Sequence, residues 1–321
     1  MKLASVADGT RDGRLAVVAP DGARVAPVEG LTLQAAIEEW PDREPDLRAL
    51  NEELAGDPDA GRPLAEVTLL SPLPRAYQWA EASSYHRHME RLRAARGIGL
   101  PLDHGKVPAV YQSSSDRFLR PDEAIPLLDP DWGLDCEATV AVAVDDVPMG
   151  TPAEAVEDHI RLVLLTNDLT HRNVLTREYG AGVGFYQAKP ARAFAPFAVT
   201  PDELGPLWRD GLLHARVVVE WNAEVLGDLR SGEDCAFDFH RIVAHMATTR
   251  DLAAGSIIGS GTVSNADPER GYGCIAERRA VDLAAGREPG DRFLRFGDRI
   301  KVEAFDPDGS SIFGALDQMV A

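Results

Sequence analysis

The chain has 321 residues, of which 45% are hydrophobic and 26% are charged, a composition typical of a folded protein with a large core. It contains 33 Lys and Arg residues against 52 Asp and Glu residues, a formal net charge of −19. So acidic a chain repels phosphate backbones and anionic lipids, which argues against nucleic-acid and membrane partners. The three cysteines lack C-x-x-C spacing, which excludes a thiolate zinc site. Because the first residues turn polar too early for a signal peptide, we expect a cytoplasmic protein.

Residues 1–70 are expected to form a small domain, and residues 71–321 the main domain. A turn signal at Pro20-Asp21-Gly22 between two apolar runs predicts a hairpin, and two stretches of helical periodicity follow. A Pro- and Gly-containing linker and a further short strand end the predicted module. These segments are Arg14–Val18, Ala23–Val28, Thr32–Trp40, Pro45–Leu54, Gly56–Pro63 and Val67–Leu70.

The main domain is expected to consist mostly of strands. Helices are predicted from Ser83 or Ser84 to Arg96, at the capping box that begins with Thr151, and over Phe237–Thr249. The predicted strands are Cys136–Val144, Leu162–Thr166, Ala215–Trp221, Ile257–Gly261 and Arg299–Phe305. Many strands with few intervening helices favour a mainly β (α+β) sandwich or roll over a doubly wound sheet.

The segment Cys136–Val144 alternates with a period of two, which is typical of a strand. One face carries Val140, Val142 and Val144, and the other carries Glu137 and Thr139 followed by two alanines. Such a small second face indicates that another layer packs against it and that Glu137 is at least partly buried. A solvent-exposed strand end is the alternative. If buried, the carboxylate needs a cation or strong hydrogen-bond donors.

Two further acidic residues stand near candidate functional positions. Asp168 ends the apolar run that begins at Leu162, where an aspartate is most often a turn former. With Glu137 it forms a candidate oxygen-ligand site for a hard divalent cation. Glu81 lies seven residues before His88, so one helix containing both would present them on nearly the same face.

Five short segments in this order resemble the fumarylacetoacetate hydrolase family. Leu134–Thr139 resembles its strand with Glu-x-Glu, Asn167–Arg172 its N-D-x-[ST]-x-R element, and Gln187–Pro190 its lysine segment. Gly259–Ser264 resembles its glycine-threonine loop, and Glu277 its later glutamate. The resemblance implies a mixed β-sandwich roll with a small N-terminal β-rich domain, usually a homodimer. It also implies a small-molecule oxo-acid or diketo substrate, which members hydrolyse at a carbon–carbon bond, decarboxylate or isomerise.

The same resemblance implies roles for individual residues. His88 falls on the catalytic histidine, Glu277 on the glutamate that orients it, and Lys189 on the catalytic lysine. The metal ligands would be Glu81, Glu137 and Asp168, holding Mg²⁺ or Ca²⁺, with Mn²⁺ as a further option. The substrate-contacting positions would be Tyr111, Arg172 and Thr262.

Two positions depart from the family pattern. Thr139 stands where the second glutamate of Glu-x-Glu is expected, and Glu81 stands where longer members have an aspartate. Because hard cations depend on ligand charge, the loss of one carboxylate should weaken metal binding or abolish it.

Three functional interpretations follow. The first is a metal-dependent hydrolase of a diketo acid with His88 as the base. The second is a divergent relative with little or no metal dependence, which would tautomerise, decarboxylate, dehydrate or cyclise a β-dicarbonyl intermediate, for example in a biosynthetic route. The third is a non-catalytic binding protein, against which the presence of His88, Glu277 and Lys189 argues. An anionic substrate also requires a locally basic mouth, which we expect from Lys189 and nearby arginines.

Overall fold

The computed structural model describes residues 1–100, 103, 105–182 and 184–321. A long mixed sheet runs through the molecule in the strand order β4-β3-β2-β1-β12-β9-β8-β17-β5-β6, with β11 paired to β9. Its strands are β1 (Lys2–Val6), β2 (Arg14–Val18), β3 (Arg24–Pro27), β4 (Arg62–Pro63), β5 (Trp79–Ala82), β6 (Val110–Ser113), β8 (Ala138–Val144), β9 (Ile160–Asn167), β11 (Ala193–Phe194), β12 (Ala198–Val199) and β17 (Ile257–Thr262).

The remaining strands form smaller sheets. One has the order β16-β15-β18-β19, and two are two-stranded, β10-β7 and β13-β14. Their bounds are β7 (Leu134–Asp135), β10 (Thr170–His171), β13 (Trp208–Arg209), β14 (Leu212–Leu213), β15 (Arg216–Trp221), β16 (Glu224–Arg230), β18 (Arg299–Phe305) and β19 (Leu316–Met319).

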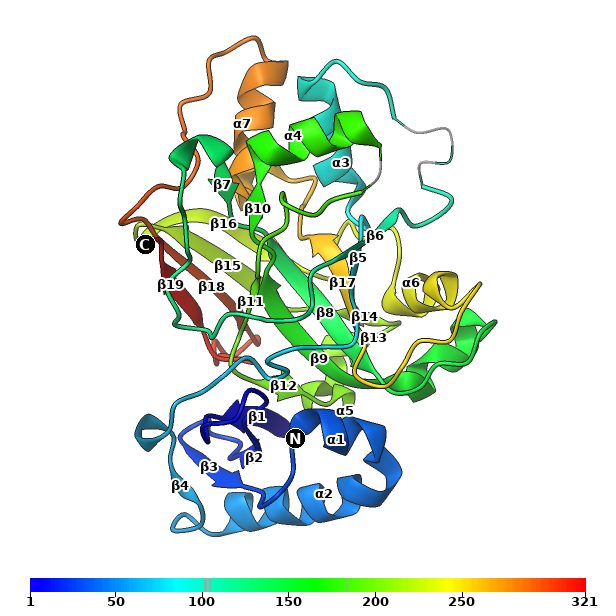
Figure 1. Cartoon of the computed structure of the whole chain (residues 1–321), viewed down its shortest axis with the longest axis vertical. Coiled ribbons are helices and arrows are strands. Elements are labelled where there is room, and N and C mark those ends of the chain that lie inside the picture. The colour runs from blue at the N-terminus through cyan, green and yellow to red at the C-terminus, as the bar shows by residue number, and fades with distance from the viewer. Residues whose placement is uncertain (101–102, 104, 183) are drawn as a thin grey trace.

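The helices lie mainly at the two ends of the molecule (Figure 1). With β1 to β4, α1 and α2 form one end, and α3, α4 and α7 gather at the other. The α-helices are α1 (Leu33–Glu38), α2 (Trp40–Gly56), α3 (His86–Ala95), α4 (Arg172–Ala181), α5 (Pro201–Leu204), α6 (Phe239–Met246) and α7 (Ile275–Ala284). Short 3₁₀ turns are η1 (Leu64–Glu66), η2 (Pro130–Trp132), η3 (Ala153–His159), η4 (Gly205–Leu207) and η5 (Pro268–Arg270).

Strand β8 is covered on both faces, as its small second face predicts. Its valines belong to the main core cluster, together with residues of β15 and β18. Ala141 and Ala143 pack in a second cluster with residues of α1 and α2. The sheet is therefore a buried middle layer at this point, and Glu137 and Thr139 are buried, at 3% and 0% exposure. The alternative of a solvent-exposed strand end is excluded.

The N-terminal segment is joined to the rest of the fold by strand pairing. The predicted hairpin is formed by β2 and β3, and β2 also pairs with β1, a strand that was not predicted. Strand β1 pairs in turn with β12, so the N-terminal strands continue the main sheet. The division of the chain at residue 70 remains a prediction.

Three local predictions are wrong. Residues 67–70 form no strand. The segment contains only an isolated β-bridge, between Leu69 and Val6. The capping box at Thr151 begins the 3₁₀ turn η3 rather than an α-helix. Glu81 lies in β5, whereas His88 lies in α3, so the two do not share a helix. Strand β5 forms because it pairs in parallel with β17, a partner about half the chain away in sequence.

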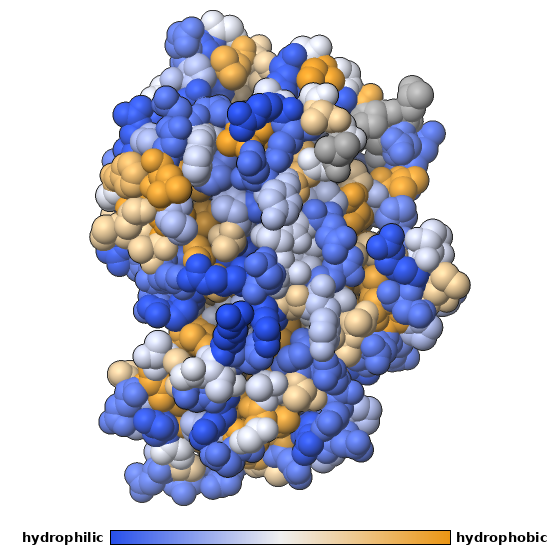
Figure 2. All heavy atoms as spheres, in the orientation of Figure 1, coloured by the Kyte–Doolittle hydropathy of each residue, from blue (hydrophilic) through white to orange (hydrophobic). Residues whose placement is uncertain are grey.

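Figure 2 shows hydrophilic and hydrophobic side chains interspersed over the visible face, as expected of a strongly charged chain. Within the described residues, no helix is both long enough and apolar enough to cross a membrane.

Candidate active site

Three buried carboxyl groups meet beside one end of the interior strands β5, β8 and β9 of the main sheet. Glu81 comes from β5, Glu137 immediately precedes β8, and Asp168 immediately follows β9. The pairing of Ala138 with Asn167 brings Glu137 and Asp168 together, and the Asp168 backbone N–H donates to the Glu137 carbonyl over 2.9 Å. Each of the three offers a carboxylate oxygen within 4.8 Å of the other two. We call this group the carboxylate cluster.

Cationic side chains neutralise the carboxylate cluster from within. The Lys189 Nζ lies 2.7 Å from Glu137 Oε2 and 2.6 Å from Asp168 Oδ2. It also donates to Thr170 Oγ1 over 2.8 Å, so all three ammonium protons have partners. Arg192 Nε donates to Asp168 Oδ1 over 2.8 Å. Because each buried charge has an opposite charge in contact, the cluster avoids the cost of unpaired burial.

Arg172 connects the cluster to the neighbouring strand β7. Its Nε donates to Asp135 Oδ2 over 2.8 Å and its Nη2 to Glu137 Oε1 over 2.5 Å. Burial by itself would raise the pKa of Glu137, but Arg172 and Lys189 outweigh it and lower that pKa to about 2. In the same way, Lys189 and Arg192 overcome burial and lower the pKa of Asp168. Both side chains therefore remain ionised.

Glu81 has a different environment. Burial, reinforced by the negative charge of Asp168, raises its pKa well above the usual value. Thr139 Oγ1 donates to Glu81 Oε1 over 3.0 Å, and the Tyr111 hydroxyl hydrogen-bonds to Glu81 Oε2. Among the three carboxyl groups, Glu81 is the one that takes up a proton most readily. Burial and the adjacent carboxylates also raise the pKa of Tyr111, which keeps its hydroxyl neutral.

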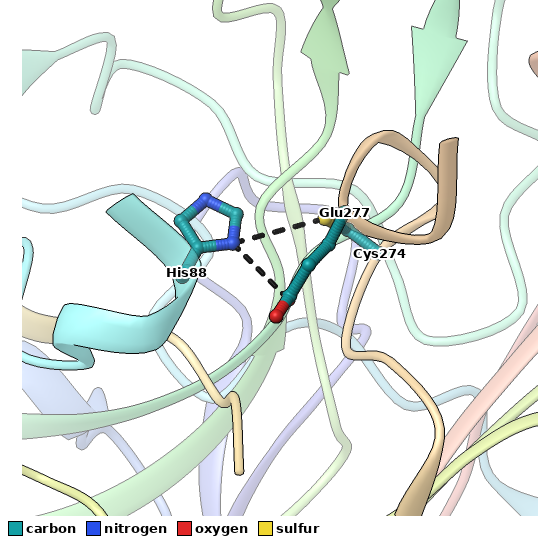
Figure 3. Close-up of side chains that lie close together, drawn as sticks. All are labelled: His88, Cys274 and Glu277. Atoms are coloured by element: carbon teal, nitrogen blue, oxygen red, sulfur yellow. Dashed lines mark hydrogen bonds and ion pairs between the residues drawn. The ribbon is translucent and has the colours of Figure 1, made fainter. Parts of the chain in front are cut away.

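His88 and Glu277 form a pair beside the cluster (Figure 3). His88 Nδ1 faces Glu277 Oε2 at 3.3 Å, and its Nε2 lies 3.9 Å from Glu137 Oε1. A carboxylate next to Nδ1 favours the tautomer protonated on that nitrogen. Nε2 is then the acceptor nitrogen.

Glu277 is held in place by other donors as well. Arg91 and Ser264 both donate to its Oε1. Burial alone would raise its pKa, but the hydrogen bonds from His88, Ser264 and Arg91 lower it. Glu277 therefore stays a carboxylate at 0% exposure.

Asp135 positions Glu277 by capping α7. The backbone N–H groups of Ile275 and Ala276 donate to its carboxylate over 2.8 and 2.9 Å. These are unpaired donors of the first turn of α7, where a negative charge is favourable. Glu277 is in that same turn. Because Asp135 also accepts from Arg172, one residue fixes both halves of the site.

Cys274 completes a group of nitrogen, sulfur and oxygen donors with His88 and Glu277. Its Sγ is 4.0 Å from His88 Nδ1 (Figure 3). Burial raises the pKa of this thiol well above its usual value, so it is not the thiolate that a soft metal requires. Both oxygens of Glu277 already have partners. The group is therefore better described as a hydrogen-bonded pair than as a metal centre.

A cavity of about 480 Å³ opens onto both groups. Its floor includes Glu81, Glu137, Lys189 and Arg172, and His88 lies at its side. Higher up it is enclosed by α3 and α4. Gly261 of β17, where the register with β8 shifts, also lines the cavity: with φ at +90°, a Cβ there would come 2.3 Å from the Ala82 carbonyl oxygen. Glycine thus permits the close approach of β17 to β5.

The donor set fits a divalent cation. Three carboxylate oxygens can converge on one ion, and oxygen is the ligand atom that hard divalent cations prefer. Thr139 supplies a hydroxyl in place of a fourth carboxylate, and the Lys189 ammonium lies against two of the three ligands. A bound ion would therefore share these oxygens with Lys189.

The structure brings all the sequence-predicted site residues to one place. Around the cavity or its two groups lie Glu81, His88, Tyr111, Glu137, Thr139, Asp168, Arg172, Lys189, Thr262 and Glu277. The expectation that Lys189 forms a basic mouth is wrong, because Lys189 and Arg172 are buried on the floor of the cavity and paired with carboxylates. The arginines that line the upper cavity are Arg93 and Arg96.

Sequence reasoning missed several supporting residues: Arg91, Asp135, Thr170 and Ser264. Asp135 stands two residues before Glu137, but only the folded chain places it at the start of α7. Thr170 lies in the N-D-x-[ST]-x-R element and Ser264 in the glycine-threonine loop, which is the signal that could have found them, whereas no motif contains Arg91. Arg192, one of the arginines near Lys189 in the sequence, pairs with Asp168.

The chain matches the fumarylacetoacetate (FAA) hydrolase C-terminal family over residues 78–321. It also matches fumarylacetoacetase N-terminal domain 2 over residues 1–75. The protein therefore belongs to the fumarylacetoacetate hydrolase family of enzymes, which confirms the resemblance and the expected fold class.

Individual relatives differ in the reaction for which they are named. Fumarylacetoacetase of Caenorhabditis elegans is 27% identical over 237 residues, covering 62% of this chain and 56% of that protein. The match thus spans little more than half of the relative. A probable 2-hydroxyhepta-2,4-diene-1,7-dioate isomerase of Mycobacterium abscessus has a TM-score of 0.69 at 21% identity, covering 99% of this chain and 97% of that chain.

A maleylpyruvate hydrolase of Sphingobium sp. SYK-6, in complex with manganese(II) and pyruvate, has a TM-score of 0.66 at 17% identity, with all of both chains covered. Hydrolases and isomerases thus share this fold. At such low identities, the structural likeness establishes the fold and leaves the reaction open.

Proposed function

We propose that the protein hydrolyses a carbon–carbon bond in a β-dicarbonyl oxo acid, with His88 as the general base. The observation that carries the proposal is the placement of His88, whose Nδ1 faces Glu277 while its Nε2 faces the carboxylate cluster. A base held in one tautomer beside a polar cavity is suited to deprotonating water. Membership of a family that includes hydrolases supports the same reaction class.

The proposed hydrolysis passes through a tetrahedral oxyanion and an enolate. His88 Nε2 takes a proton from water, and the oxygen attacks the carbonyl carbon distal to the oxo acid. The tetrahedral oxyanion collapses, the bond to the central carbon breaks, and its electron pair becomes the enolate of the oxo-acid product. The imidazolium returns the proton to that carbon. Glu277, ionised and facing Nδ1, stabilises the imidazolium in between.

Lys189 contributes charge rather than a free hydrogen bond in this scheme, because its three protons already have partners. Its positive charge on the cavity floor favours the developing enolate. Tyr111, Arg172 and Thr262 line the same cavity and are the proposed substrate contacts. A divalent cation held by the carboxylate cluster, Mg²⁺, Ca²⁺ or Mn²⁺, would supply Lewis-acid stabilisation of that enolate.

A second candidate is a reaction of the same enolate without hydrolysis, such as isomerisation, decarboxylation or cyclisation with little metal. It is favoured by the contacts of Lys189 with two cluster carboxylates and by the replacement of a fourth carboxylate with Thr139. An ammonium ion can stabilise an enolate in place of a metal.

Turnover in H₂¹⁸O separates these candidates. The purified protein is incubated with 2,4-dioxo acids and Mn²⁺, and products are analysed by mass spectrometry and proton NMR. Hydrolysis places one ¹⁸O atom in the new carboxylic acid and releases pyruvate. Release of CO₂, or an isomer of unchanged mass, would refute hydrolysis in favour of the second candidate. Binding without turnover would favour a non-catalytic binding protein.

The homodimer remains a prediction, which size-exclusion chromatography with light scattering tests.

A further inference from the structure

The upper part of the cavity differs from its floor in lacking charged pairs. Its walls are formed by Met89 and Leu92 of α3, Leu175 of α4, Val110 of β6 and Phe185. We call these five residues the apolar wall. We infer that the substrate carries an extended apolar group on the carbonyl distal to its oxo acid, rather than a second carboxylate. This inference rests on the proposed function and specifies the substrate class of the same site.

The proposed base, His88, lies on the same helix face as Leu92 of the apolar wall. His88 and Leu92 are four residues apart on α3, so they lie one above the other on one face of the helix. A carbonyl within reach of His88 therefore has its outward substituent next to Leu92. Leu175 lies on the facing helix, is 5% exposed and adds a second aliphatic surface.

Aromatic packing gives the wall a fixed shape. The Phe185 ring meets Tyr111 edge-on with ring centroids 5.2 Å apart, and meets Tyr179 edge-on at 4.8 Å. Tyr111 is itself anchored to the carboxylate cluster by its hydroxyl. The wall therefore continues directly from the cluster. A carboxylate placed against it would lose water without gaining a donor.

The cations on the cavity floor are paired with carboxylates, whereas the arginines near the mouth contact a backbone carbonyl and an aromatic ring. On the floor, Lys189 and Arg172 contact carboxylates. Near the mouth, Arg93 Nε donates to the Gly99 carbonyl over 2.7 Å, and the Arg96 guanidinium lies 5.5 Å from the centroid of the Tyr179 ring. No pairing of Arg93 or Arg96 with a carboxylate is found among the described residues. A substrate ending in a carboxylate at these arginines is therefore the competing outcome of the test.

The test measures the turnover of three 2,4-dioxo acids by the purified protein in the presence of Mn²⁺. 2,4-Dioxopentanoate ends in a methyl group, 2,4-dioxononanoate in a pentyl group, and 2,4-dioxononanedioate matches the pentyl compound in length but ends in a carboxylate. We expect kcat/KM to rise roughly threefold per methylene from the methyl to the pentyl compound. The dicarboxylate should be at least about tenfold poorer than the pentyl compound, because its charged end cannot enter the wall without desolvation.

Binding is measured separately from turnover. The matching 2-oxo acids, 2-oxopentanoate, 2-oxononanoate and 2-oxononanedioate, lack the second carbonyl and cannot undergo the proposed cleavage. Calorimetry should show the tightest binding for 2-oxononanoate. Graded binding without turnover of any dioxo acid would retain the apolar subsite and refute the proposed hydrolysis.

Variants of the apolar wall test whether it causes the preference for the pentyl over the methyl compound. Leu175→Gln and Leu92→Gln should lower the ratio of kcat/KM for the pentyl over the methyl compound, and the same ratio of affinities, at least about threefold. Leu128→Gln is the matched control, because Leu128 is 84% exposed and does not line the cavity. Equal kcat/KM for all three dioxo acids, a preference for the dicarboxylate, or no graded binding would overturn the inference. The first two results would leave the proposed hydrolysis intact.

Discussion

The carboxylate cluster and the His88–Glu277 pair lie side by side in one cavity but are built in opposite ways. In the cluster, Lys189, Arg172 and Arg192 saturate the carboxylates, so the ionised groups are fixed by several contacts each. In the pair, only one side is saturated. Glu277 has donors on both oxygens, whereas His88 Nε2 has no closer polar contact than Glu137 at 3.9 Å among the described residues.

This difference indicates that the cluster stabilises charge, whereas the pair transfers protons. A fully paired cluster is electrostatically preorganised, so it can stabilise charge without moving. A histidine with one nitrogen fixed and the other free can accept and return a proton. We therefore expect variants of the pair to change the chemistry with little effect on stability, and variants of the cluster to change stability and ion binding.

The largest effect is expected from His88→Ala. Loss of the general base should lower kcat by about 10³-fold with the fold retained. His245→Ala is the control, because His245 is an exposed histidine on α6. Steady-state kinetics on a turned-over dioxo acid, with circular dichroism to check the fold, measure the outcome. Full retained turnover in His88→Ala would end its assignment as the base.

Lys189→Met tests the cluster. Removing the ammonium leaves Glu137 and Asp168 buried without one of their cations, which should destabilise the fold by about 3–5 kcal/mol. Urea unfolding measures this change, and repeating it with Mn²⁺ shows whether an ion replaces the lost charge. Lys301→Met removes a partly exposed lysine paired with Glu303 and should cost less than about 1 kcal/mol. Equal stabilities of the two variants would mean that Lys189 is not the counter-ion of the cluster.

Thr139→Glu asks whether the missing carboxylate limits ion binding. Thr139 is 0% exposed and its hydroxyl contacts Glu81, so a glutamate there adds a fourth carboxylate to the cluster. Divalent-ion affinity should rise about tenfold or more, because hard cations follow ligand charge. Calorimetry with Mg²⁺, Mn²⁺ and Ca²⁺ measures it, and Thr139→Gln provides a side chain of the same length without the charge. Identical affinities for the Glu and Gln variants would show that charge at position 139 does not govern binding.

The sequence predicted the cluster better than the helices around it. The alanines after Thr139 indicated a covered strand face, and the structure confirms that Glu137 is buried. The shared helix for Glu81 and His88 was wrong, because a seven-residue spacing carries no information about the chain reversal between them. What makes residues 79–82 a strand is parallel pairing with β17, a contact between distant segments.

Roles that depend on several distant segments were also beyond the sequence. Asp135 caps α7 and binds Arg172, but an aspartate in a short strand has no local pattern that indicates a helix 140 residues away. No local pattern distinguishes Arg192 from the other arginines, because its contact with Asp168 depends on the pairing of β11 with β9. Local patterns thus predicted which groups are buried, and long-range pairing decided which groups meet.

The smallest effect concerns a second histidine–glutamate pair, between His240 of α6 and Glu157 of η3, which serves as the exposed counterpart of His88–Glu277. The hydrogen bond that His240 donates to Glu157 raises the pKa of His240, and the same bond lowers the pKa of Glu157. The histidine contribution to stability is fully present below its unfolded pKa of about 6.5 and is lost as the pH rises through the folded value. The glutamate contribution is present above its unfolded pKa of about 4.3 and is lost as the pH falls through the folded value.

The pair should therefore stabilise the fold most near pH 5.5. The stability difference between wild type and His240→Gln, measured by urea unfolding, should be largest there, below about 1 kcal/mol, and should shrink by pH 8.5. In a Glu157→Gln background, His240→Gln should have no such pH dependence, which completes a double-mutant cycle. A pH-independent difference in the wild-type background would mean that the two residues do not form an ion pair. Since this pair lies outside the cavity lining, its loss should leave kcat unchanged, unlike the loss of His88.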